Sequence, residues 1–301
     1  MIHWILLSLL SGVFLGLYDI AKKSAVRDNA VAVVLLLNVV TAALIWTVPV
    51  LAAGWQPAPD DWLAPLRYVP ARTHGLLMLK SIVVGASWSC AFFALKHLPI
   101  SIATPIRATS PLWTVIYAVA AMGERPSVYQ WVGIVIVVSA FIAFSRVGAR
   151  EGIRFHRDRF VALMVAATLL GAGSALYDKY LLQTESLSPL VVQAWFSIYL
   201  VPVMLPLAIR WWRQERSQKP FQWRWSIPLI ALCLLIADFA YFQAVSAEGA
   251  MISVISPLRR AAIVIPFMFG ILSLREKNWR AKAPCIVAIL IGVALLSRGP
   301  E

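Results

Sequence analysis

The tripeptide Leu-Tyr-Asp occurs twice near the end of an apolar run, at residues 17–19 and 176–178, and lysines follow both copies. An ionisable group inside a membrane is costly, so it usually faces the interior of a helix bundle and serves a transport pathway. Because the motif is duplicated, we predict that Asp19 and Asp178 carry coupling protons. The alternative is that they anchor the ends of two helices at the membrane surface.

Two arginines follow a proline by two positions, Arg107 after Pro105 and Arg259 after Pro257. Proline cannot donate a hydrogen bond to the helix, so it leaves a carbonyl free and weakens the helix at that point. A guanidinium offers a planar fork of donors that suits a carboxylate or a phosphate. Pairing with an aspartate inside the membrane is the alternative role. The predicted substrate-binding residues are Arg107, Arg259, Tyr18 and Tyr177.

The ionisable residues inside the apolar runs carry more positive than negative charge. The central parts of the runs hold one acid, Asp238, and four bases, Lys80, Arg107, Arg259 and Arg260. The two repeated aspartates raise the number of acids to three. The remaining excess favours an anionic or zwitterionic substrate over a cationic one. Asp238 is a third candidate for proton coupling.

The composition is that of a protein that crosses a membrane many times. Of the 301 residues, 60% are hydrophobic and 14% are charged, and the mean hydropathy is +0.77. Soluble domains have about 25% charged residues. The net charge of +13 comes from bases in short stretches between apolar runs, which indicates lipid headgroups and not nucleic acid. No metal-ligand or nucleotide motif occurs. We therefore expect no cofactor and no metal, the lipid bilayer and a small molecule as partners, and a monomer or homodimer.

The fold class follows from the length of the apolar runs. Most have about the 20 residues that a helix needs to cross the hydrocarbon core, and hydrocarbon offers the backbone no other hydrogen-bond partner. We predict an all-α membrane protein with ten transmembrane helices. The ten expected spans are 2–21, 30–53, 75–96, 101–121, 128–146, 160–182, 188–209, 227–246, 250–273 and 282–297.

The second half of the chain repeats the first. The two Leu-Tyr-Asp copies align at an offset of 159 residues, and TPIRA at 104–108 aligns with SPLRR at 256–260 at an offset of 152. We predict two repeats, 1–146 and 160–301, joined by a basic linker at 147–159. An odd number of spans in each repeat gives them opposite orientations, an arrangement that is typical of secondary transporters.

Residues 94–146 also carry a family pattern. A short turn and a proline-bearing segment precede Gly-Glu-Arg at 123–125, and Gln-Trp-Val-Gly follows at 130–133. This stretch resembles the second half of an EamA domain, of the drug/metabolite transporter superfamily, and residues 240–298 resemble it more distantly. The resemblance covers nearly the whole chain and implies a ten-helix carrier for small metabolites that works by alternating access. GLYD at 16–19 replaces the family's first-helix pattern, so no substrate is carried over.

Together these features predict a secondary transporter for a small polar metabolite, anionic or zwitterionic, driven by protons or by exchange, and not an enzyme. Two alternatives remain open. One is a membrane-embedded enzyme that handles phosphate or lipid headgroups through its arginines. The other is a membrane subunit that transports nothing itself.

The orientation in the cell membrane follows from the basic residues. Loops after odd-numbered spans hold 18 of the 27 lysines and arginines, loops on the other side hold 5, and 4 lie within spans. Since cytoplasmic loops are enriched in lysine and arginine, this bias predicts that both termini lie outside the cytoplasm. The family resemblance implies the opposite orientation.

Overall fold

The structure is a computed structural model, which describes most of the chain. The described residues are 2–54, 63–113, 116–117, 127–149, 153, 155–218, 220–247, 250, 255, 258–259, 262–276 and 278–296.

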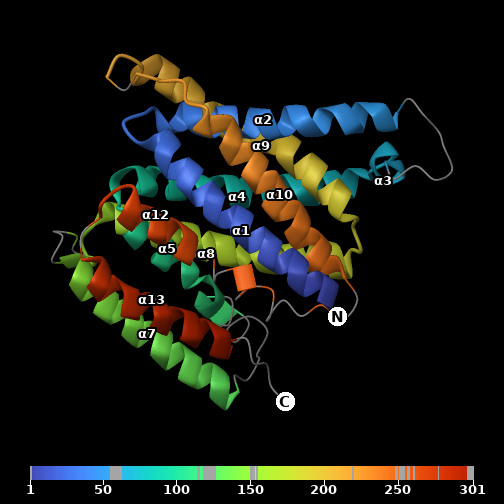
Figure 1. Ribbon diagram of the computed structural model, residues 1–301. Helices are drawn as coiled ribbons and strands as arrows, with labels where there is room; N and C mark the ends of the chain where they lie inside the picture. The colour runs from blue at the N-terminus through green and yellow to red at the C-terminus, as the bar shows by residue number, and fades with distance from the viewer. Residues whose placement is uncertain are drawn as a thin grey trace.

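Throughout these described ranges the regular structure is helical, as predicted (Figure 1). Seven helices are long and apolar enough to cross a membrane, and they stand where seven of the ten spans were expected. They are α1 (Ile2–Val26), α2 (Val31–Ala53), α4 (Ala71–His97), α7 (Val128–Ala149), α8 (Arg159–Lys179) with the π-helix η1 (Tyr180–Thr184), α9 (Pro189–Gln214) and α10 (Ser226–Ser246).

Shorter helices occupy the places of the other three expected spans. The fourth contains α5 (Ile100–Ala108), the ninth contains α12 (Val264–Leu272), and the tenth corresponds to α13 (Trp279–Leu296). Much of the fourth and ninth spans lies outside the described residues. A single short helix, α3 (Ala64–Arg67), lies between α2 and α4.

Local sequence explains where two of the long helices begin. The side chain of Asp158 accepts hydrogen bonds from the backbone N–H groups of Phe160 and Val161 and so caps α8. Ser188 caps α9 in the same way, with Pro189 in the first helical turn. A capping carboxylate or hydroxyl satisfies N–H groups that have no partner within the helix. These caps fix the start of α8 at the end of the predicted basic linker.

The two halves of the chain are packed through each other. The most extensive helix contacts join a helix of the first half to one of the second: α1 with α10, α4 with α8, α2 with α9, and α7 with α13. Figure 1 shows α7 and α13 side by side at one edge of the bundle and α2 at the opposite edge. Large apolar side chains on the outer faces remain exposed, as expected for a surface that contacts lipid.

All the described odd-numbered loops meet at one end of the bundle. Lys23 in α1 donates to the Leu95 and Leu98 carbonyls at the end of α4 (2.8 and 2.6 Å). Arg224, after α9, donates to the Ser24 and Arg27 carbonyls at the end of α1 (2.7 and 2.6 Å). Glu276, after α12, accepts from the N–H groups of Ile100 and Ser101 at the start of α5 (2.8 and 3.0 Å).

Contacts at the other end join the even-numbered loops. Arg72, in the first turn of α4, pairs with Glu185, after η1, at 2.8 Å. Gln183 donates to the carbonyl of Val245 near the end of α10 at 3.1 Å. The two sets of loops therefore lie at opposite ends of the helices.

Candidate substrate and coupling site

The first Leu-Tyr-Asp copy lies inside the bundle, about two turns before the end of α1. The helix continues to Val26, so the expected boundary at residue 21 was wrong and Lys22 belongs to the span. Lys22 Nζ lies 2.6 Å from Asp19 Oδ1, and its side chain is 1% exposed. It also lies 4.3 Å from the centre of the Tyr18 ring. Burial on this scale makes Lys22 an interior residue and not a surface anchor.

Arg107 approaches the same carboxylate from α5. Its Nη1 lies 3.3 Å from Asp19 Oδ1. The helix that carries it ends at Ala108, three residues after Pro105, and the chain turns at Thr109. Arg107 therefore lies in the last turn of a helix, and the carbonyls of Ile106 and Arg107 at this end accept from the Thr109 N–H group. In the second half, Pro257, which corresponds to Pro105, and Arg260 lie outside the described residues.

The second aspartate of the repeated motif pairs with the other half of the chain. Asp178 in α8 forms an ion pair and hydrogen bond with Lys80 in α4, and both side chains are buried. Lys80 Nζ also lies over the rings of Phe196 and Phe242, at 4.7 and 5.0 Å from their centres. Directly after Asp178 the helix widens into the π-helix η1, a feature that is frequent at functional sites.

The second arginine joins the two halves at another point. Arg259 Nε donates to Ser11 Oγ in α1 at 2.9 Å, and its Nη2 lies 3.3 Å from Asp238 Oδ1 in α10. Its guanidinium carbon lies 4.0 Å from the centre of the Tyr241 ring. The close approach depends on Gly12, since a Cβ there would lie 3.3 Å from the backbone oxygen of Leu258.

The repeated tyrosines do not share one environment. Tyr18 is 1% exposed and lies under Lys22. Tyr177 instead donates a hydrogen bond to the Leu76 carbonyl at 3.2 Å and stacks against Tyr180. Its contacts therefore lie towards the end of the even-numbered loops. The structure brings Tyr18, but not Tyr177, next to the charged residues.

These charges form one polar interior within the described part of the chain. Asp238 interacts electrostatically with Lys80 and Asp178 as well as with Arg259, and Tyr18 interacts with both Arg107 and Asp238. The described members are four bases, Lys22, Lys80, Arg107 and Arg259, and three acids, Asp19, Asp178 and Asp238. The formal balance is one positive charge. Sequence reasoning missed Lys22 because it assigned that lysine to the following loop.

A small cavity touches this polar interior at Asp238. It has a volume of about 10 Å³ and lies between α2, α4, α9 and α10. Asn38, Gln193 and Ser197 line it together with Asp238. Sequence reasoning did not select these three residues, although Asn38 and Gln193 each stand out as an amide within a long apolar run.

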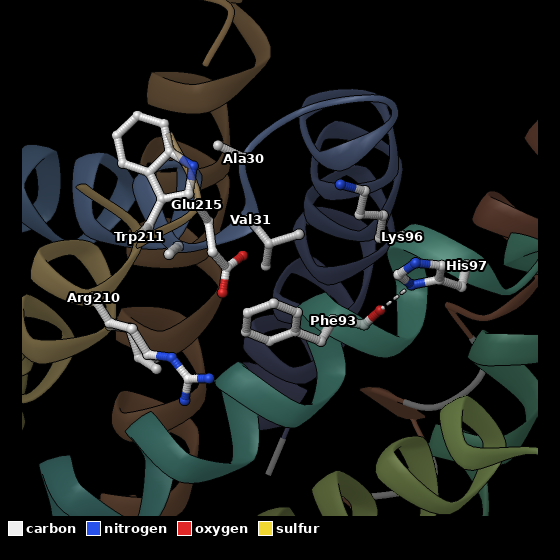
Figure 2. Close-up of a pocket in the computed structure, with 10 residues that line it drawn as sticks. Ala30, Val31, Phe93, Lys96, His97, Arg210, Trp211 and Glu215 are labelled. Carbon is white, nitrogen blue, oxygen red and sulfur yellow. Dashed lines mark hydrogen bonds between the residues drawn. The ribbon is translucent and has the colours of Figure 1, made fainter. Parts of the chain in front are cut away.

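A larger cavity, of about 320 Å³, opens at the end of the odd-numbered loops. Figure 2 shows Lys96 and His97 at the end of α4 facing Arg210 and Glu215 at the end of α9, with Phe93 between them. Its lining shares no residue with the charged interior, so it is a feature of the membrane surface and not part of the candidate site.

Comparison with known proteins identifies the first half of the chain. The EamA-like transporter family model matches residues 2–146. The match covers the predicted first repeat and confirms the resemblance seen in the Gly-Glu-Arg and Gln-Trp motifs. Together with the seven helices of membrane-spanning length among the described residues, it indicates a multi-pass membrane protein.

A relative and a solved structure extend this comparison. The chain is 29% identical over 138 residues to an uncharacterized transporter in the cobO 3′ region of a Sinorhizobium species, a match that covers 45% of this chain and 92% of the relative. The fold is similar to that of a protein known only as "Crystal structure of protein", with a TM-score of 0.61, 19% identity and coverage of 97% and 94% of the two chains. The family and the relative indicate a membrane transporter.

Proposed function

We propose that this protein is a secondary transporter that moves a small polar metabolite, anionic or zwitterionic, across the cell membrane. The observation that carries the proposal is the excess of one positive charge among the described residues of the buried network, which are four bases and three acids. A buried charge without compensation is strongly destabilising. A carboxylate or phosphate of the substrate would supply the compensating charge, and the guanidinium groups of Arg107 and Arg259 suit such groups.

Two inverted repeats of five helices, residues 1–146 and 160–301, would provide alternating access. The helix contacts support this arrangement because they occur in matched pairs. The contact of α1 with α10 corresponds to the contact of α8 with α4. In the same way, the contact of α4 with α9 corresponds to the contact of α10 with α2. A two-fold relation between the halves exchanges the members of each pair.

Proton coupling or exchange would use the three carboxylates of the interior. Asp19, Asp178 and Asp238 each contact a base. One of these ion pairs, Lys80–Asp178, joins the two halves, and the hydrogen bond from Arg259 to Ser11 joins them at a second point. Protonation of an aspartate removes the negative charge that attracts the paired lysine or arginine. The pair can then separate at low cost, which is what a carrier needs when one half moves against the other.

We place the end that carries the odd-numbered loops in the cytoplasm and both termini outside. Lys22 and Lys282 are buried, which reduces the 18 bases counted for these loops to 16, against 5 on the other side. A C-terminal fusion tests the assignment. A fluorescent protein that folds only in the cytoplasm should stay dark, and a periplasm-dependent phosphatase should be active. Bright fluorescence with an inactive phosphatase would reverse the orientation.

Uptake into proteoliposomes tests transport itself. Purified protein is reconstituted, incubated with a total metabolite extract, washed and analysed by mass spectrometry for retained solutes. We expect one or a few anionic or zwitterionic solutes to accumulate unchanged, and to be absent from empty liposomes and from an Arg107→Ala, Arg259→Ala double variant. Chemical conversion of a solute would favour a membrane-embedded enzyme. If no solute is retained, the proposed transport function is contradicted.

A further inference from the structure

Two buried amide side chains lack the partner that buried polar atoms require. The carbonyl oxygens of Asn38 in α2 and Gln193 in α9 have no hydrogen-bond partner among the described residues, although both side chains are 1% exposed. Asn29 shows what a satisfied amide looks like in this chain. It donates to the carbonyls of Ala25 and Gln222 and accepts from the N–H groups of Ala30 and Gln222.

The two amide residues belong to the lining of one cavity. Asn38 and Gln193 line the interior space of about 10 Å³ that also contains Asp238. A volume of this size accommodates one water-sized group. A whole metabolite does not fit, so only one end of a larger molecule would enter.

The chemistry of the lining defines that end. Besides the two amide oxygens, the cavity contains the carboxylate of Asp238, whose Oδ1 contacts Arg259 at 3.3 Å. The hydroxyl of Ser197 donates to the backbone carbonyl of Gln193 at 2.7 Å, so it offers an oxygen and no proton. The carboxylate, the two amide oxygens and the hydroxyl oxygen of the lining are thus acceptors, beside the N–H groups of the two amides. An ammonium group brings three donors to the carboxylate and the two amide oxygens, whereas water brings two.

We propose that Asn38, Gln193 and Asp238 form a subsite for the primary ammonium group of a zwitterionic substrate. This proposal rests on the proposed transport function and narrows its substrate class. Arg259 contacts Asp238 on the neighbouring side, so a carboxylate of the same substrate has a guanidinium within reach of the ammonium. Trp88 lines the cavity as well, and an indole ring attracts a cation.

Methylammonium chloride is the probe that tests the subsite without knowledge of the substrate. The thermal unfolding midpoint of the purified full chain is measured at equal ionic strength in methylammonium, tetramethylammonium and sodium chloride. We expect methylammonium alone to raise the midpoint, by about 2–4 °C at about ten times its Kd. Tetramethylammonium carries the same charge without N–H donors and should give no rise.

Variants then locate the effect. Asn38→Leu and Gln193→Leu should abolish the methylammonium shift and leave the unliganded midpoint unchanged or higher, because they remove polar atoms that have no partner. Asn29→Leu is the matched control at a satisfied amide. It should lower the midpoint and keep the shift. Ser8→Ala, at a buried hydroxyl bonded to the Trp4 carbonyl, is the second control.

Three results would overturn the subsite. Equal stabilisation by sodium would indicate a metal cation at the cavity, equal stabilisation by tetramethylammonium would indicate a general salt effect, and a lower unliganded midpoint in both leucine variants would indicate a structural water. The uptake assay tests the transport function separately. A methylammonium shift without solute uptake would support the subsite and contradict the transport function. Uptake of an anion that has no amine, without any methylammonium shift, would support the transport function and contradict the subsite.

Discussion

Two buried lysines of this protein have similar surroundings but different connections. Lys22 and Lys80 each contact one aspartate of the repeated motif, and each lies near two aromatic rings. Lys22 and Asp19 are three residues apart on one helix. Lys80 and Asp178 are 98 residues apart and join α4 of the first half to α8 of the second.

This difference indicates different roles for the two aspartate–lysine pairs, although the sequence motif is the same in both. A pair within one helix moves as a unit and survives any displacement of the halves. A pair between halves must lengthen or break when they move against each other. We infer that the Lys80–Asp178 ion pair lengthens or breaks when the carrier changes conformation. The Lys22–Asp19 pair instead sets the charge next to Arg107.

The largest expected effect is on stability. Lys80→Met leaves Asp178 buried without its partner and should lower the free energy of unfolding by about 3–5 kcal/mol. Lys22→Met should cost less, because Asp19 keeps Arg107 at 3.3 Å. Unfolding in detergent measures both.

Two controls belong to that experiment. Adding Asp178→Leu to Lys80→Met should restore most of the loss, because both buried charges are then removed. Arg72→Gln breaks an ion pair whose arginine side chain is 73% exposed and should cost less than about 1 kcal/mol. Equal destabilisation by Lys80→Met and Lys22→Met would remove the distinction between the two pairs.

The next effect concerns the arginines. Arg259 contacts Ser11, Asp238 and the Tyr241 ring, whereas Arg107 forms a salt bridge with Asp19. Lysine cannot reproduce a planar fork. We expect Arg259→Lys to weaken binding of the transported solute by about tenfold or more, roughly 1.4 kcal/mol, and Arg107→Lys to weaken it less. Wild-type affinity in both variants, measured by calorimetry, would make the arginines structural counter-ions.

A smaller effect compares the glycines that precede the two repeated motifs. A Cβ at Gly12 would lie 3.3 Å from Leu258 O and 3.4 Å from Arg259 Cα, whereas one at Gly171 would meet only Ser87 Oγ, at 3.7 Å. Gly12→Ala should therefore displace Arg259 and cost about 1 kcal/mol, the low end of the range for overpacking. Gly171→Ala should be tolerated. Thermal unfolding of the two variants side by side checks this, and equal midpoints would contradict it.

The sequence predicts the long helices well, since apolar runs of membrane length have few alternatives in lipid. It places the end of α1 wrongly because Lys22 looks like a loop residue. Only the fold shows that Asp19 and two aromatic rings surround that lysine. The partners of the repeated aspartates are equally hidden, because Lys80 meets Asp178 across 98 residues. Asn38 and Gln193 belong to no motif, and only their shared cavity relates them.

The central claim is that the aspartate pair between the halves couples transport and the pair within α1 does not. Uptake driven by an imposed pH gradient, measured in proteoliposomes with the accumulated solute, tests it most directly. We expect Asp178→Asn to abolish the response to the gradient while exchange without a gradient persists, and Asp19→Asn to retain a reduced response. Both variants should insert and keep wild-type helix content. An unchanged pH response in Asp178→Asn, or equal loss in both variants, would contradict the claim.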